Sequence, residues 1–341
     1  MKHAMPSGLI EATQLMRAGR LTEATAAIQR MLRQQPSEAP FHHHKSGRVL
    51  DGEFSRVKET KRPATPPGSF ISGSFTNAAG TRPYKLYIPD AHPGKALPLI
   101  VMLHGCTQTP DDFAAGTRMN ALAHERNCFI LYPEQTQAAN RSRCWNWFKR
   151  GHQQREQGEP AIIAGMTRDV ISRYAMDPRK VYVAGLSAGG AMAAVMGAAY
   201  PEVYSAVGIH SGLAVGSAHD VPSAFAAMRG TPASSPARST AVSTLPVILF
   251  HGDRDNTVHP RNSEPVIDAV AHTQRSVEQG QVPNGHAYTR TRYRDATGRV
   301  VLEHWLVHGA GHAWSGGSPV GSYTDPSGPD AALAMLDFFF Q

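Results

Sequence analysis

Short apolar runs alternate with longer amphipathic stretches along most of the chain from residue 70 onward. A continuous apolar run of about four to eight residues is typical of a strand buried on both faces. The stretches between these runs place apolar residues at helical spacing, so strands and helices alternate. Strands are predicted at 97–105, 128–133, 180–185, 204–212, 246–252 and 300–309, and helices at 111–126, 160–176, 187–200, 262–276 and 329–340.

This alternation predicts an α/β fold with a mostly parallel central sheet and helices on both faces. Residues 70–90 add a β-hairpin, because strand-like alternation lies on both sides of a glycine-containing turn. In sheets of this kind, ligands bind in the loops at the carboxyl ends of the strands. Candidate catalytic residues are therefore expected at those ends.

The N-terminal part of the chain has a different pattern. Residues 1–35 carry apolar positions at helical spacing with a break at Gly19, which predicts two short helices or one kinked helix. This segment either docks on its own domain or mediates a homodimer. Residues 36–69 mix Pro, Ser, Lys and His without periodicity, which predicts a linker. The main domain is expected at 70–341.

Charge and composition narrow the function classes. The net charge is +7, but residues 1–69 hold 11 Lys/Arg against 6 Asp/Glu, so the main domain is nearly neutral. No basic block with interleaved aromatic residues occurs in residues 1–69, where the basic excess lies, which argues against a nucleic-acid partner. No apolar run reaches the roughly 20 residues of a membrane span. The first 20 residues lack the apolar core of a signal peptide, so we expect a cytoplasmic protein by default.

A serine stands between two glycines at the end of a predicted strand. The stretch 185–189 reads Gly-Leu-Ser-Ala-Gly and matches the G-x-S-x-G nucleophile elbow, with a small-residue helix after it. Glycines are needed there because the backbone turns sharply and approaches its neighbours closely. The alternative is an ordinary turn of small residues. The strand–turn–helix context favours Ser187 as a nucleophile.

A serine nucleophile needs a general base, and the base needs a carboxylate to orient it. In this arrangement the carboxylate and then the histidine follow the serine along the chain. Asp253 and Asp255 both follow the strand at 246–252. Asp255 is our candidate carboxylate, because an Asp three residues after a glycine is the usual loop arrangement here, and Asp253 is the alternative, nearer the end of the strand. His312 is the candidate base, with His259 second, because it lies in a glycine-rich loop after the last strand.

Acyl transfer also needs hydrogen-bond donors for the oxyanion that develops on the substrate. One expected donor is the backbone N–H of Ala188, directly after the candidate nucleophile. The second is expected in the loop after the strand at 97–105, at the backbone N–H of Cys106.

Several motifs together resemble the poly(3-hydroxybutyrate) depolymerase family of esterases and the related feruloyl and acetylxylan esterases. The motifs are HGCTQT (104–109), CWNWF (144–148), GLSAGG (185–190), HGDRDNTVHP (251–260) and GAGHAWSGG (309–317). The resemblance covers about residues 70–341. It implies an α/β-hydrolase fold and hydrolysis of carboxylic esters without a metal or other cofactor. It implies the same triad and the same two oxyanion donors.

Two of the three cysteines, Cys106 and Cys144, fall inside these motifs. On that resemblance we expect a disulfide between them, although a reducing cytosol would keep it open. Cys128 is expected to be a buried free thiol. Trp147 and Trp314 lie in or beside the motifs and are candidates for lining the substrate site, with core packing as the alternative.

The sequence therefore predicts a serine carboxylester hydrolase for short-chain or 3-hydroxyalkanoate-type esters, whose partner is a small or oligomeric substrate. Secreted depolymerases of this family usually carry a leader and a polymer-binding domain, and neither is recognised here, so small soluble esters are the expected substrates. Three alternatives stay open: a feruloyl or acetylxylan-type esterase, a serine peptidase with the same triad, and a binding scaffold without catalysis.

Overall fold

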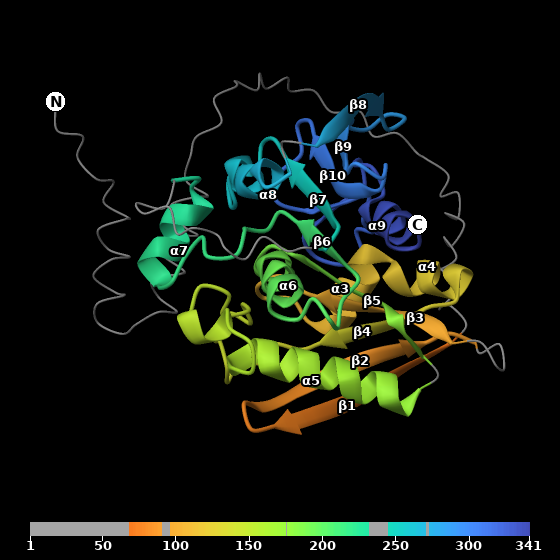
Figure 1. Cartoon of the computed structure of the whole chain (residues 1–341), viewed down its shortest axis with the longest axis vertical. Helices are drawn as coiled ribbons and strands as arrows, with labels where there is room; N and C mark the ends of the chain where they lie inside the picture. The colour runs from red at the N-terminus through yellow and green to blue at the C-terminus, as the bar shows by residue number, and fades with distance from the viewer. Residues whose placement is uncertain (1–67, 91–95, 175, 232–244, 271–272) are drawn as a thin grey trace, which may run out of the picture. The chain divides into compact units, whose positions relative to one another are not determined.

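The computed structural model describes residues 68–90, 96–174, 176–231, 245–270 and 273–341. These residues form a ten-stranded sheet with the strand order β1-β2-β4-β3-β5-β6-β7-β10-β9-β8, with helices around it (Figure 1). The strands are β1 (Ser69–Asn77), β2 (Gly80–Ile88), β3 (Leu97–Leu103), β4 (Phe129–Pro133), β5 (Met176–Leu186), β6 (Ala206–His210), β7 (Val247–Gly252), β8 (Gln274–Gln281), β9 (Ala287–Arg294) and β10 (Val300–Val307). A small second sheet pairs β11 (Trp314–Ser315) with β12 (Thr324–Asp325). The helices are α3 (Pro110–Thr117), α4 (Met119–Arg126), η1 (Arg150–His152), α5 (Gly158–Arg173), α6 (Ala188–Ala199), α7 (Val221–Met228), η2 (Pro260–Ser263), α8 (Glu264–Asp268) and α9 (Ala331–Phe339).

The centre of the sheet is parallel. Strands β4, β3, β5, β6, β7 and β10 pair in parallel, whereas β1, β2, β9 and β8 add antiparallel pairs at the two sides. The predicted mostly parallel sheet is confirmed, and so is the hairpin at 70–90, which forms β1 and β2. Because β3, β5, β6, β7 and β10 run parallel, the loops that follow them all leave from the carboxyl ends of the strands, on the same side of the sheet.

Both faces of the central sheet are covered by helices, because its strands are apolar on both sides. In β3, Leu99, Val101 and Leu103 belong to one buried cluster, together with apolar residues of α5 and α6. The alternate residues Ile100 and Met102 belong to a second cluster, with residues of α3, α4 and α9. The continuous apolar run therefore reflects a strand with a core on each face.

Two helix predictions need correction. The helix expected at 262–276 is wrong in its second half, because α8 ends at Asp268 and β8 begins at Gln274. Strands β8 and β9 were not predicted at all, because β8 is almost entirely exposed and both carry mainly polar residues. The helix expected at 111–126 is two helices, separated by Arg118 in the left-handed conformation (φ 57°).

The predicted helical segment 1–35 and nearly all of the linker 36–69 lie outside the described residues. Both therefore remain predictions, as does a homodimer through the N-terminal helices. Within the ranges that the structure describes, no helix has the length and apolarity required to cross a membrane.

Candidate active site

Ser187 occupies a strained turn between β5 and α6. Its backbone has φ 57° and ψ −119°, which is rare for a residue with a side chain, and its N–H donates to the carbonyl of His210 at 2.9 Å. The flanking glycines allow this turn. A Cβ on Gly189 would lie 1.9 Å from the carbonyl oxygen of Leu103, and one on Gly185 would lie 2.4 Å from the backbone of Gly189. The elbow therefore packs directly against the end of β3.

The structure brings Asp255 and His312 together. Asp255 follows β7, is 2% exposed, and its Oδ2 lies 2.7 Å from Nδ1 of His312. Its Oδ1 accepts the backbone N–H groups of Thr257 (2.9 Å) and Val258 (2.8 Å). Burial favours a higher pKa for this carboxyl, but the hydrogen bonds and the adjacent His312 outweigh it and hold the pKa below its ordinary value. Asp255 is therefore an anion that fixes one side of the imidazole ring.

The alternative carboxylate, Asp253, has a different task. Its Oδ2 lies 3.0 Å from Nδ1 of His308 and its Oδ1 accepts the N–H of Gly309 at 2.7 Å. The N–H of Asp253 donates to the carbonyl of Val307. Asp253 thus ties the end of β7 to the start of the loop that carries His312.

His210, at the end of β6, connects the elbow with the loop of His312. Its carbonyl accepts the N–H of Ser187, and its Nε2 accepts the N–H of Ser315 at 3.0 Å. Its ring stacks on Trp314, with the ring centroids 5.0 Å apart. Burial lowers the pKa of His210 to about 3, so the ring is neutral and able to accept. The sequence offered no signal for this role, because His210 reads as one more residue of an apolar strand.

Ser187 and His312 therefore lie on loops at the carboxyl ends of the parallel strands. The hydrogen bonds of His210 to Ser187 and Ser315 connect these two loops. The hydrogen bonds found among the described residues include none between Ser187 Oγ and the His312 ring. Such contacts are often long before substrate binds. His259, the second candidate base, instead accepts the N–H of Arg261 at the start of η2.

The two expected oxyanion donors lie on neighbouring loops. Ala188 is the first residue of α6, so its N–H has no partner inside the helix. A Cβ on Gly105 would lie 3.5 Å from the carbonyl of Leu186, which places the loop of Cys106 beside the elbow. In the part of the chain that the structure describes, the N–H of Cys106 also has no hydrogen-bond partner.

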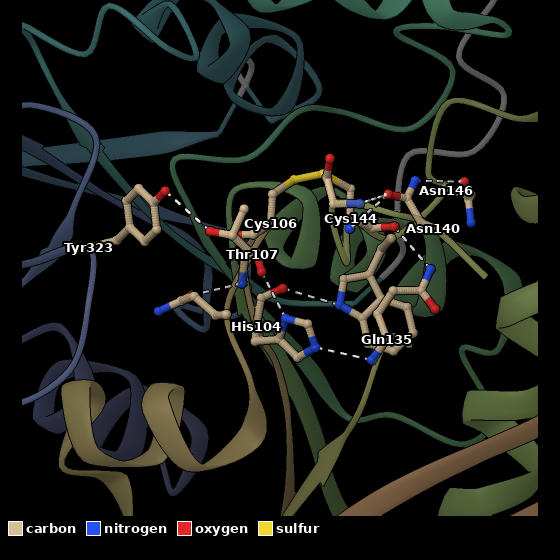
Figure 2. Close-up of a disulfide and its surroundings, with 12 residues drawn as sticks. His104, Cys106, Thr107, Gln135, Asn140, Cys144, Asn146 and Tyr323 are labelled. Carbon is tan, nitrogen blue, oxygen red and sulfur yellow. Dashed lines mark hydrogen bonds between the residues drawn. A yellow bond between two sulfur atoms is a disulfide. The ribbon is translucent and has the colours of Figure 1, made fainter. Parts of the chain in front are cut away.

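A disulfide joins Cys106 to Cys144 and holds this loop (Figure 2). The N–H of Thr107 donates to Ser142 at 2.7 Å, and Nε1 of Trp145 donates to the carbonyl of His104 at 3.1 Å. The segment around Cys144 therefore holds the loop of Cys106 through three contacts: the disulfide and these two hydrogen bonds. Cys128 is a buried free thiol, as expected, and burial raises its pKa.

A buried carboxylate anchors that segment in turn. Glu159, at the start of α5, is 1% exposed and accepts from the backbone and the side chain of Asn146 at 2.7 and 2.6 Å. It also accepts from Gln135 at 2.5 Å, and Gln135 donates to the carbonyl of Cys144. Burial alone would raise the pKa of Glu159, but the hydrogen bonds of His152 and Asn146 lower it. Glu159 was not predicted as a site residue, because a glutamate in the first turn of a helix is common and the neighbouring sequence gives no sign that this one is buried.

The two tryptophans proposed to line the site are both buried. Trp147 is 6% exposed and packs in the core, in edge contact with Phe148. Trp314 is 1% exposed and lies between His210 and Phe113. Its Nε1 is buried without a hydrogen-bond partner. In this conformation both rings pack in the core, and contact with substrate remains a prediction for each. Among the described residues, no group of three or more His, Cys, Asp or Glu is arranged to hold a metal ion.

The sheet and the site together define the class of protein. An acetyl xylan esterase from Aspergillus awamori superposes with a TM-score of 0.63 at 20% identity, covering 79% of this chain and 99% of that one. The predicted α/β-hydrolase fold is confirmed. The family model described as "Esterase PHB depolymerase" matches residues 82–276, more than half of the 341 residues. The chain belongs to this esterase family.

Curated relatives have several names. A poly(3-hydroxyalkanoate) depolymerase C from Paucimonas lemoignei is 31% identical over 261 residues, which cover 73% of this chain and 61% of the relative. A poly(3-hydroxybutyrate) depolymerase from Ralstonia pickettii is 30% identical, covering 71% of this chain and 53% of the relative. Feruloyl esterase B from Neurospora crassa is 30% identical, with 70% of this chain and 85% of the relative covered. The chain thus spans little more than half the length of the two depolymerases.

Proposed function

We propose that this protein is a serine carboxylester hydrolase in which Ser187, His312 and Asp255 act as nucleophile, base and orienting carboxylate. The observation that carries this proposal is the hydrogen bond of 2.7 Å between Asp255 and His312, on a loop connected to the strained turn of Ser187. Membership of an esterase family supports the same reaction class.

The proposed reaction has two halves. His312 takes the proton of Ser187 Oγ as this oxygen attacks the ester carbonyl, and the N–H groups of Cys106 and Ala188 bind the resulting oxyanion. The tetrahedral intermediate collapses to an acyl-enzyme, and the alcohol leaves with the proton from His312. Water, deprotonated by the same histidine, then attacks the acyl-enzyme; the acid is released as the bond to Ser187 Oγ breaks and His312 returns the proton to this oxygen. Asp255 holds the imidazole in one tautomer and stabilises its positive form.

As substrates we propose short-chain esters and soluble 3-hydroxyalkanoate oligoesters. The names of the two bacterial depolymerase relatives support this class. The relative named feruloyl esterase B, most of whose length aligns with this chain, supports aryl and carbohydrate esters as a second candidate class.

The test is Ser187→Ala, assayed in a pH-stat on methyl acetate, a 3-hydroxybutyrate trimer and methyl ferulate. We expect kcat to fall at least about a thousandfold on every ester that the wild type cleaves, with the circular dichroism spectrum unchanged. Ser205→Ala is the matched control, because the hydroxyl of this serine donates to the carbonyl of Arg179, away from the proposed site, and the substitution keeps its backbone N–H bond to Val181. Substantial activity of the Ser187 variant would contradict the mechanism, and the preferred ester identifies the substrate class.

A further inference from the structure

Tyr323 is an exposed aromatic residue close to the proposed oxyanion loop. Among the described residues, few large hydrophobic side chains are exposed, and Tyr323, at 48%, is one of two aromatic ones; the other is Phe225 of α7. Single exposed apolar residues are common and need no explanation by themselves. The surroundings of Tyr323 distinguish it.

The backbone around this ring is fixed on both sides. The carbonyl of Tyr323 accepts the N–H of Trp314 at 2.7 Å, and Thr324 pairs with Trp314 in the small sheet. The preceding residue, Ser322, donates its N–H to Asp112 at 2.8 Å. Tyr323 itself has φ 53°, an uncommon conformation for a residue with a side chain. A rigid, strained backbone thus holds an apolar ring in solvent, and such strain clusters at functional sites.

The phenol of Tyr323 reaches the residue after the proposed oxyanion donor. Its oxygen lies 3.2 Å from Oγ1 of Thr107, as Figure 2 shows. Thr107 uses its one hydroxyl proton to donate to the carbonyl of Cys106 at 2.6 Å. Tyr323 is therefore the donor to Thr107. This bond places the ring beside the loop of Cys106. The residue after Tyr323, Thr324, pairs with Trp314, which lies two positions after His312 in the sequence.

We propose that Tyr323 is a specificity-determining residue that packs its ring on the part of an ester substrate that extends beyond the scissile group. An exposed aromatic ring gains stability by covering apolar surface. A short ester such as methyl acetate has nothing to place there, whereas an oligoester with further apolar units does. The preferred substrates are then extended, partly apolar esters. This inference rests on the proposed function and adds a site for the neighbouring unit.

The experiment compares kcat/KM for a 3-hydroxybutyrate trimer and for methyl acetate in a pH-stat. Tyr323→Ala is expected to lower the ratio of trimer to methyl acetate activity about tenfold, mainly through KM for the trimer, since one lost apolar contact has that effect. Tyr323→Phe keeps the ring and removes the donor to Thr107, so it should keep a ratio near that of the wild type. Val277→Ala, at an exposed position of β8, is the control for a general surface change.

The outcomes separate this inference from the proposed function. If the wild type cleaves none of methyl acetate, the trimer and methyl ferulate, the proposed function is wrong, and this inference falls with it. If it cleaves methyl ferulate but neither of the other two esters, the serine esterase stands and the role of Tyr323 is wrong. If it cleaves only methyl acetate, or if Tyr323→Ala lowers both activities equally or neither, the role of Tyr323 alone is wrong. A fall in the ratio for Tyr323→Phe as large as for Tyr323→Ala would also overturn it, because the hydrogen bond to Thr107 would then be the cause.

Discussion

Asp253 and Asp255 stand two positions apart after β7 and bind different histidines, which makes them a natural pair of variants. Asp255→Asn should lower kcat about ten-thousandfold, because the amide stabilises the wrong imidazole tautomer and cannot stabilise its positive form. Asp253→Asn should leave kcat within about tenfold and lower the free energy of unfolding by about 1–2 kcal/mol, since it weakens the anchor of the loop. Steady-state kinetics and urea unfolding measure both. Equal kinetic losses in the two variants would mean that the distinction between them is wrong.

The residues that could be predicted at this scale are those with a local motif. Ser187, Asp255 and His312 lie in recognisable loops after apolar strands, so their positions follow from chain order. Glu159 and Tyr323 could not be singled out from the sequence, because the anchoring role of Glu159 and the proposed role of Tyr323 depend on contacts with other segments, such as those of Asn146 and Thr107. A single glutamate or tyrosine has no periodicity that would mark it.

The elbow between β5 and α6 shows how closely an element must fit its neighbour. Gly189→Ala should destabilise the protein by about 3 kcal/mol, because its Cβ would lie 1.9 Å from the carbonyl of Leu103 and the helix would have to shift. Gly311→Ala is the matched change, since nothing lies within 4 Å of the Cβ there. The free energies of unfolding should differ clearly. If Gly189→Ala is tolerated as well as Gly311→Ala, the tight packing of the elbow is not needed for stability.

Among the elements, the central strands could be predicted and the outer ones could not. Strands such as β3 and β7 are buried on both faces, so the side chains on each face contact the core and are mostly apolar. The strand therefore appears in the sequence as a continuous apolar run. β8 is almost wholly exposed, and β9 lies between it and β10 with mainly polar side chains. β8 and β9 form because they pair with neighbouring strands, and such pairing leaves no pattern of apolar residues within either segment.

Histidines whose rings are buried or half-buried make the stability of the whole molecule depend on pH. Burial lowers the pKa of His104 and of His304 to about 4, and that of His210 to about 3, from 6.5. The unfolded chain therefore binds more protons than the folded one between these values, and the free energy of unfolding falls as the pH drops below about 6.5. It should level off only below the folded pKa values. At pH above 7 these rings contribute no such dependence.

Urea unfolding at pH 7.5, 6 and 5 measures this effect. His304→Leu should make the decline shallower, because it removes one group whose Nε2 is buried without a partner. His219→Leu, a change at an exposed histidine, should keep the slope of the wild type. A wild type that is equally stable at pH 7.5 and 5 would contradict the account of the buried rings.

The chain has three cysteines, of which Cys106 and Cys144 are joined and Cys128 is buried. No thiolate is therefore available on the folded, oxidised protein, since the one free thiol is inaccessible and its pKa is raised. Maleimide and iodoacetamide reagents should leave it unmodified. A cysteine introduced on the surface would then be the one labelled position, so a fluorophore placed beside Tyr323 would test the proposed substrate contact there without background from native thiols.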